Sequence, residues 1–161
     1  MINQPHYPTK DDPFPDHPFA CFFGMLKGED LQKLADDIDL NGQNHPGIIY
    51  QDHILDGRNR YEAIALLNEQ RKAEGKPLKA FNYEVFKGSE IQALRKVQSL
   101  NIHRRNLDPS QKSAIAVRIL EKLEALAKET GTGLSQKGRK SEQASEAIGV
   151  GTTLIKQARA V

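Results

Sequence analysis

The chain has 161 residues and a net charge of +2, and its 38% hydrophobic and 27% charged residues are ordinary for a globular protein that buries a core. It has no apolar run near the roughly 18–20 residues of a membrane helix, no signal-peptide pattern and only one cysteine, which excludes an internal disulfide or a cysteine-based zinc cluster. From these absences we expect a cytoplasmic protein with no membrane association. The five histidines lack the spacing of metal ligands, so we expect no metal site.

The charge is unevenly distributed along the chain. Up to Leu55 there are three lysines and arginines against nine aspartates and glutamates, whereas from Asp56 onward there are twenty against twelve. The second part therefore carries a net charge of +8 and is where an anionic partner would bind. The alternative is a charged face that is simply solvated.

The N-terminal 40 residues predict an arm, a short apolar segment and a helix. Residues 1–18 contain five prolines among polar residues, which predicts an extended, poorly ordered arm. The apolar residues 19–23 are expected to enter the core as a strand or extended segment, with Cys21 a buried, inert thiol. Residues 29–40 have apolar side chains on one face, which predicts an amphipathic helix that ends at Asn41-Gly42.

The next stretch combines a hairpin, a turn and a helix. Residues 48–50 and 54–55 predict two strands of a tight hairpin, and helical spacing of apolar residues predicts a helix over 58–73. Gly57 lies between them and can adopt a positive φ. A helix start favours anions such as phosphate, and Arg58 and Arg60 would add donors there. The alternative is that Gly57 only makes the turn and both arginines are solvated.

The following segments complete a small α+β unit and begin a longer helix. Residues 81–86 alternate apolar and polar side chains, which predicts a half-buried strand, and Ser89 is expected to cap a helix with Ile91 on its inner face. Asp108, Pro109 and Gln111 predict the start of a helix that ends near residue 128. Arg104 and Arg105 precede this helix, either as the second half of an anion site or as surface charges on a linker.

The last third of the chain predicts a DNA-binding element. Residues 130–140 form a basic loop, and residues 141–159 have the pattern of a helix-turn-helix. Short pairs of Ala/Gly-rich helices without this function are the alternative. Val161 follows the second helix directly, so a DNA-binding domain over 106–161 would be truncated. The residues expected to contact DNA are Lys137, Arg139, Lys140, Gly151, Thr152, Thr153, Lys156, Gln157 and Arg159.

The order of these parts resembles the ParB-type partition proteins of plasmids and chromosomes. Residues 54–63 resemble that family's Gly-Glu-Arg-Arg-x-Arg-Ala box, residues 101–104 resemble its Glu-Asn-x-x-Arg box, and Asp108-Pro109-Ser110 with the helix-turn-helix matches its DNA-binding domain. The resemblance covers residues 19–161. The Asp-Gly-Arg-Asn-Arg version of the first box is similar to ParB-like proteins of plasmids and phages.

The resemblance implies an α+β fold, with a small ParB/sulfiredoxin-like mixed sheet and helices followed by an all-α helix-turn-helix segment. It implies a nucleotide-binding domain over 19–105 and the DNA-binding domain over 106–161, and these follow the extended arm over 1–18 that the prolines predict. Family members bind CTP and act as sliding clamps on DNA, so the implied ligand is CTP or another nucleoside triphosphate with Mg²⁺. The implied nucleotide-binding residues are Gly57, Arg60, Asn101 and Arg104, which match the family's phosphate contacts, with Arg58, Asn59 and Arg105 beside them.

The implied partners are double-stranded DNA and a nucleotide, and the implied location is the bacterial nucleoid, with a plasmid or phage association. A homodimer and a partner ATPase are left open. Sulfiredoxin chemistry is excluded because Arg58 stands where that family has its catalytic cysteine. Two alternatives remain: a protein-interaction module with solvated arginines, or a nucleotide-dependent phosphotransferase or nuclease, at most a slow nucleoside triphosphatase, with Asp56 acting through Mg²⁺.

Overall fold

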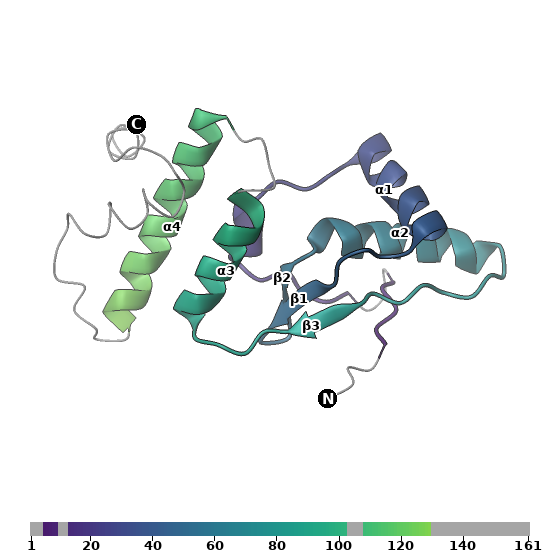
Figure 1. Ribbon diagram of the computed structural model, residues 1–161, viewed down its shortest axis with the longest axis horizontal. Coiled ribbons are helices and arrows are strands. Elements are labelled where there is room, and N and C mark those ends of the chain that lie inside the picture. The colour runs from purple at the N-terminus through teal and green to yellow at the C-terminus, as the bar shows by residue number, and fades with distance from the viewer. Residues whose placement is uncertain (1–4, 10–12, 103–107, 130–161) are drawn as a thin grey trace. The chain divides into compact units, whose positions relative to one another are not determined.

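The computed structural model describes residues 5–9, 13–102 and 108–129 (Figure 1). The chain divides into two compact units, Met1–Gly88 and Ser89–Val161. The functional domain limits inferred from the resemblance, at residues 18 and 105, stay predictions.

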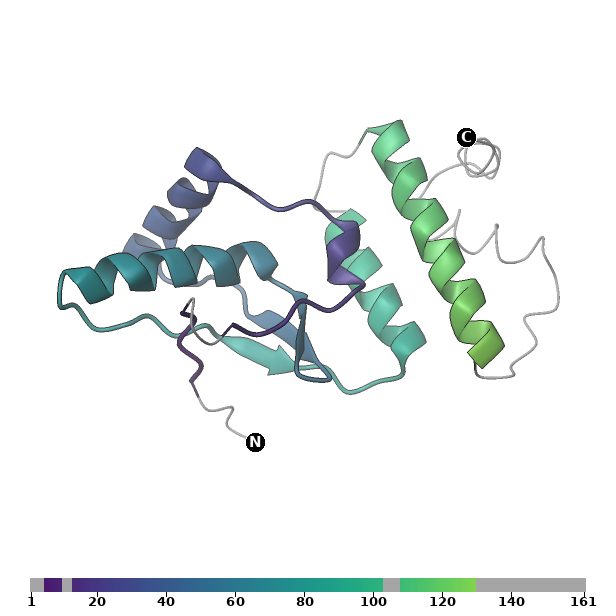
Figure 2. The ribbon, with the colours of Figure 1, turned by 180° about the vertical axis from the view of Figure 1, so that it is seen from behind.

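The first unit is α+β, with a mixed three-stranded sheet and helices α1 and α2 on one face of it (Figures 1 and 2). The strand order is β2-β1-β3, in which β1 pairs antiparallel with β2 and parallel with β3. This confirms the predicted fold class. The elements are η1 (Ala20–Phe22), α1 (Gly28–Asn41), β1 (Gly47–Tyr50), β2 (His53–Asp56), α2 (Arg58–Ala73) and β3 (Tyr83–Val85).

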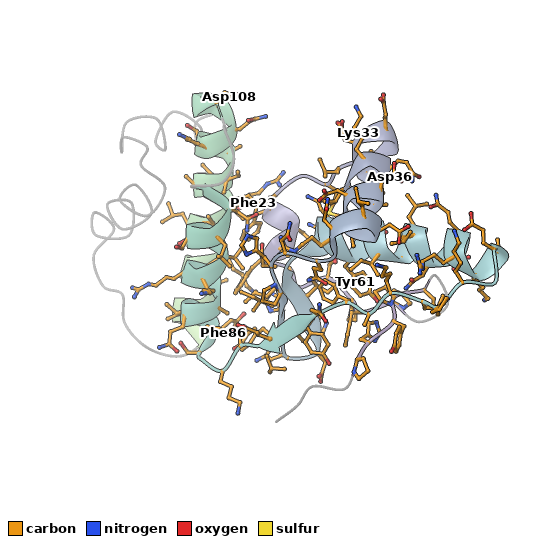
Figure 3. All side chains as sticks on the ribbon, turned by 45° about the vertical axis from the view of Figure 1, so that its right-hand side comes forward. Phe23, Lys33, Asp36, Tyr61, Phe86 and Asp108 are labelled. Carbon is orange, nitrogen blue, oxygen red and sulfur yellow. The ribbon has the colours of Figure 1, made fainter. Side chains whose placement is uncertain are left out.

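The hairpin and both helices of this unit follow from local signals. Gln51 and Asp52 form the two-residue turn between β1 and β2, with φ of 50° and 59°, the left-handed pair that matches the twist of a hairpin. Helix α1 ends where the Gly42 N–H donates to the carbonyl of Ile38 at 3.0 Å, and Gly42 has a φ of 80°. Lys33 and Asp36 lie on the outer face of α1 (Figure 3).

The core of the first unit lies between α1, α2 and the sheet. Its buried residues lie in β1 and β2, just before β3, and on the inner faces of both helices. They are Ala35, Ile38, Ile49, Ile54, Tyr61, Ala63, Ile64, Leu67 and Phe81. Burying such side chains contributes about 1.5–3 kcal/mol each for the larger ones. The apolar pattern of residues 58–67 is therefore explained by packing against both α1 and the sheet.

The described part of the N-terminal arm is extended, but the expectation that it is poorly ordered is wrong. The Phe81 N–H donates to the carbonyl of His6 at 2.7 Å, and the Tyr61 hydroxyl accepts a hydrogen bond from the Phe14 N–H at 2.8 Å. Pro8 is buried. The prolines remove few donors that the sheet needs, because the arm bonds mainly through its carbonyls and a few non-proline N–H groups.

Residues 19–23 also differ from the expectation, because they contain the 3-10 helix η1 and not a strand. Phe19 and Phe23 are buried, with 0% and 5% of their surface exposed, whereas Cys21 is exposed. With three residues per turn, Ala20 and Phe23 share the inner side and Cys21 lies on the outer side. Cys21 is therefore not the buried thiol that its apolar neighbours predict.

The second unit contains α3 (Glu90–Ile102) and α4 (Pro109–Glu129). Ser89 and Asp108 cap these helices as predicted, and each takes part in a capping box. At α3 the Gln92 N–H donates to Ser89 Oγ at 3.3 Å and the Ser89 N–H donates to Gln92 Oε1 at 2.8 Å. At α4 Asp108 and Gln111 exchange equivalent bonds of 2.9 and 3.1 Å. Ile91, expected to face inward, is 37% exposed because it lies in the first turn of α3.

The buried faces of these two helices are mainly apolar, and Gln98 on α3 and Ser113 on α4 are buried polar residues. Ala93, Leu94 and Val97 are buried on α3, and Ile115, Ala116, Ile119 and Leu120 are buried on α4. The predicted helix-turn-helix over 141–159 lies outside the described residues. Among the helices that the structure describes, none has an apolar stretch of the length that a bilayer requires.

Candidate functional site

The candidate site is the turn from β2 into α2. Gly57 is the N-cap residue of α2, with a φ of 99° and a ψ of 15°, and no side chain caps the helix there. The first intrahelical bond is donated by the Tyr61 N–H to the Gly57 carbonyl at 2.9 Å. The N–H groups of residues 58–60 therefore point out of the helix start, where the positive end of the helix dipole also lies.

Gly57 is required at this turn by its conformation and by its neighbours. A Cβ atom on Gly57 would lie 3.0 Å from Gly47 Cα and 3.1 Å from Arg60 Nη2. Gly47 in turn packs against the Phe81 ring, which a Cβ on Gly47 would overlap. The two glycines thus let the start of β1 approach the start of α2, and the turn from β2 into α2 is confirmed as predicted.

Arg60 lies at the centre of this turn. Its Nη2 donates to Asp56 Oδ2 at 3.1 Å and to the carbonyl of Pro46 at 3.3 Å, and its side chain is 19% exposed. Its Nε is buried and has no hydrogen-bond partner among the described residues. Buried donors almost always have partners in native proteins, so this N–H marks the turn as a candidate site for an acceptor, either a water molecule or an anionic group of a ligand.

Asp56, the carboxylate suspected in the enzyme alternative, is 12% exposed and bound to Arg60. This ion pair holds the Nη2 atom of the guanidinium, whereas the Nε atom lies beside Gly57 at the turn. No group of three or more histidine, cysteine, aspartate or glutamate side chains in the described part of the chain is arranged to hold a metal ion.

The first two side chains of α2, those of Arg58 and Asn59, point to a different place from Arg60. Arg58 Nε donates to Asp16 Oδ2 at 2.7 Å, and Arg58 Nη1 donates to the carbonyls of Ala20 at 2.8 Å and Phe23 at 3.3 Å. Asn59 Oδ1 accepts the Leu26 N–H at 2.9 Å. Both residues thus bind the segment that precedes α1.

The other predicted site residues fall in the second unit or outside the described part. Asn101 is half-buried in the last turn of α3, where its Nδ2 donates to the carbonyl of Val97 at 3.0 Å. Arg104 and Arg105 lie outside the described residues. So do all the predicted DNA contacts, which are Lys137, Arg139, Lys140, Gly151, Thr152, Thr153, Lys156, Gln157 and Arg159.

Comparison with protein-family models gives no match, and comparison with curated proteins gives none either. Among solved structures, a Pnob8-like ParB-N domain matches with a TM-score of 0.58 at 14% sequence identity, over 94% of this chain and 67% of that one. This chain has the ParB-N fold. The likeness concerns the fold, since 14% identity is too low to carry a function.

Two structures of C-terminally truncated ParB from Caulobacter crescentus also match, both at 19% identity and over 88% of this chain. One is complexed with CTP-γ-S, with a TM-score of 0.40 and 67% of its chain covered. The other is complexed to the centromeric parS site, with a TM-score of 0.46 and 62% of its chain covered. At these scores the assignment of the ParB-N fold depends on the Pnob8-like domain.

Within the ParB-N fold, sequence reasoning located the turn but missed the partners of its side chains. Asp16, which binds Arg58, is 42 positions away and lies in the proline-rich arm. Pro46, whose carbonyl binds Arg60, offers only a main-chain atom. No local pattern marks either residue, so only the fold could have identified them.

Proposed function

We propose that this chain is a DNA-binding protein of the ParB type, regulated by a nucleotide and acting in plasmid or chromosome partition or in related transcription control. The observation that carries the proposal is Arg60 Nε, which is buried beside the uncapped first turn of α2 and has no partner among the described residues. A donor of this kind favours an anionic oxygen. The ParB-N fold and the resemblance of residues 54–63 to a phosphate-binding box support the same assignment.

The proposed ligand is CTP or another nucleoside triphosphate with Mg²⁺. One phosphate group accepts hydrogen bonds from the main-chain N–H groups that begin α2 and from Arg60 Nε. Asp56 and the Pro46 carbonyl hold the guanidinium in place before the ligand arrives, which lowers the entropic cost of binding. Asn101, Arg104 and Arg105 are the proposed second half of the site, on the strength of the resemblance alone.

The proposed DNA contacts belong to the second unit, which is the basic one. The second unit has thirteen lysines and arginines against seven carboxylates, whereas the first has ten against fourteen, so their net charges are +6 and −4. A positive charge of this size favours a polyanion such as the DNA backbone. Thr152, Thr153 and Gln157 are assigned to bases, and Lys137, Arg139, Lys140, Lys156 and Arg159 to phosphates.

The DNA part of the proposal is tested by the salt dependence of binding to a fluorescent duplex. We expect the double variant Lys140→Ala/Arg159→Ala to bind more weakly at all sequences and to reduce the slope of log K against log salt by about 2. The matched control is Lys33→Ala/Lys76→Ala, which removes two exposed charges from the first unit and should leave the slope unchanged. An unchanged slope in the first double variant would contradict the placement of these residues on DNA.

The regulatory part is tested in the same assay with CTP and Mg²⁺ present. We expect the nucleotide to change the DNA affinity of the wild type and to leave that of Arg60→Ala unchanged. Equal nucleotide effects in both proteins would refute regulation through this turn.

A further inference from the structure

Residues 15–26, which we call the strap, lie along the same strand, turn and helix that make up the candidate site (Figure 2). The strap begins beside β2, where the Ile54 N–H donates to the Pro15 carbonyl at 2.8 Å and the His17 N–H donates to the Ile54 carbonyl at 3.0 Å. Ile54 lies three residues before Gly57. The strap therefore covers the outer edge of the strand that leads into the site.

The strap is held a second time by the first two residues of α2. Arg58 binds the Asp16 carboxylate and also the carbonyls of Ala20, the first residue of η1, and Phe23, its C-cap residue (Phe23 is labelled in Figure 3). Its side chain is 16% exposed, so these three hydrogen bonds are made by a largely buried guanidinium. A buried cation with one carboxylate and two carbonyl partners is well satisfied, which fixes its position.

Asn59 holds the far end of the strap. Its Oδ1 accepts the N–H of Leu26, two residues before α1 begins. The contacts of Arg58 and Asn59 thus span the strap from Asp16 to Leu26. Both side chains leave α2 from the turn whose main-chain N–H groups form the proposed phosphate site.

We propose that Arg58 and Asn59 are positioning residues that lock the strap onto the first turn of α2, and that nucleotide binding at this turn is coupled to the locked strap. The coupling rests on the proposed function. A phosphate held by main-chain N–H groups requires them to keep one arrangement, and the strap restrains the turn that carries them. Thermodynamic reciprocity then requires that a bound nucleotide stabilises the strap in its locked position on α2.

Amide hydrogen exchange followed by NMR tests the lock, and the 18.0 kDa chain is small enough for this method. The reporters are the N–H groups of His17, Leu26 and Ile54, which bond the strap to β2 and α2. We expect Asp16→Ala to accelerate exchange at His17 and Ile54 by about twofold to fivefold, the value for one partly exposed ion pair. Unchanged exchange in this variant would overturn the lock.

The matched control is Glu29→Ala, which removes the ion pair between Glu29 and Lys33 from the exposed surface of the same unit. The N–O distance of that pair is 3.0 Å, against 2.7 Å for Arg58 and Asp16. It should leave the three reporters unchanged. Because Asp16→Ala retains the buried guanidinium and its two carbonyl partners, we expect it to fold. Arg58→Ala removes all three contacts, and a fluorophore on the exposed Cys21 would then report greater mobility of η1 through lower anisotropy.

The coupling is tested by adding CTP at a hundredfold excess over its Kd. In the wild type we expect exchange at His17, Leu26 and Ile54 to slow by about tenfold or more, up to the hundredfold limit of full linkage. Arg60→Ala should keep the slow exchange of the nucleotide-free wild type and gain nothing from CTP. Nucleotide binding without slower exchange would overturn the coupling and leave the proposed function intact. A wild type that binds no nucleotide would overturn both, while Asp16→Ala would still decide the lock.

Discussion

Replacing Gly57 with alanine tests whether the turn into α2 needs glycine for two separate reasons. The first is the φ of 99°, because an L-residue in the left-handed region costs about 1–2 kcal/mol. The second is space, because the new Cβ would lie 3.0 Å from Gly47 Cα, a backbone atom that cannot rotate away. Such overpacking adds about 1 kcal/mol. We therefore expect Gly57→Ala to lower the free energy of unfolding of the first unit by about 2–3 kcal/mol.

Two other glycines separate these costs. Gly75 has a φ of 68° but nothing within 4 Å of an added Cβ, so Gly75→Ala should cost about 1 kcal/mol through conformation alone. Gly24 has open space and no positive φ, so Gly24→Ala should change stability by less than about 0.5 kcal/mol. Urea unfolding followed by tyrosine fluorescence measures the first unit, because the chain has no tryptophan and its four tyrosines all lie there.

The order Gly24→Ala, Gly75→Ala, Gly57→Ala in increasing cost is the signature of the proposed geometry. If Gly57→Ala were no more destabilising than Gly75→Ala, the close approach of the Gly57 and Gly47 backbones would be refuted.

Four further substitutions test other parts of the structure. Asn68→Ala should cost about 2–3 kcal/mol in the same unfolding assay, because the 1% exposed amide makes three hydrogen bonds to main-chain groups; a cost below about 1 kcal/mol would contradict this. Leu40→Gln should leave stability within about 0.5 kcal/mol of the wild type, because Leu40 is 84% exposed. Asp108→Ala should destabilise α4 by about 1 kcal/mol, measured as earlier loss of helical circular dichroism. Asp56→Asn should weaken nucleotide binding about tenfold by releasing Arg60, whereas retained binding with lost hydrolysis would support an enzyme instead.

The elements that sequence reasoning located are those with strong local signals. The limits of α2, 58–73, follow from apolar spacing after a glycine turn, and both capping boxes follow from residue pairs three positions apart. The hairpin follows from two short apolar runs, 48–50 and 54–55, that are close together in the sequence. In each of these cases the residues that determine the element lie within a few positions of it.

The parts that could not be predicted depend on partners far along the chain. The proline-rich arm has no periodicity, yet its carbonyls and N–H groups pair with β2, Tyr61 and Phe81. The position of Arg58 in the phosphate box predicts a contact with a ligand, but its nearest acceptor in the structure is Asp16 in the arm. The parallel pairing of β3 with β1 likewise requires the tertiary fold. A local pattern gives a side chain's type and position, whereas its direction depends on these distant partners.

The central claim is that the first turn of α2 and Arg60 bind the phosphates of a nucleotide. Calorimetry with CTP, ATP and GTP in the presence of Mg²⁺, on the wild type and two arginine variants, tests it most directly. Arg71 is the matched control, because it lies in the last turn of the same helix, is 17% exposed and pairs with Asp39 at 2.6 Å. We expect one nucleotide to bind the wild type and Arg71→Ala equally, and to bind Arg60→Ala at least about tenfold more weakly. Equal binding to Arg60→Ala, or binding of no nucleotide by the wild type, would contradict the claim.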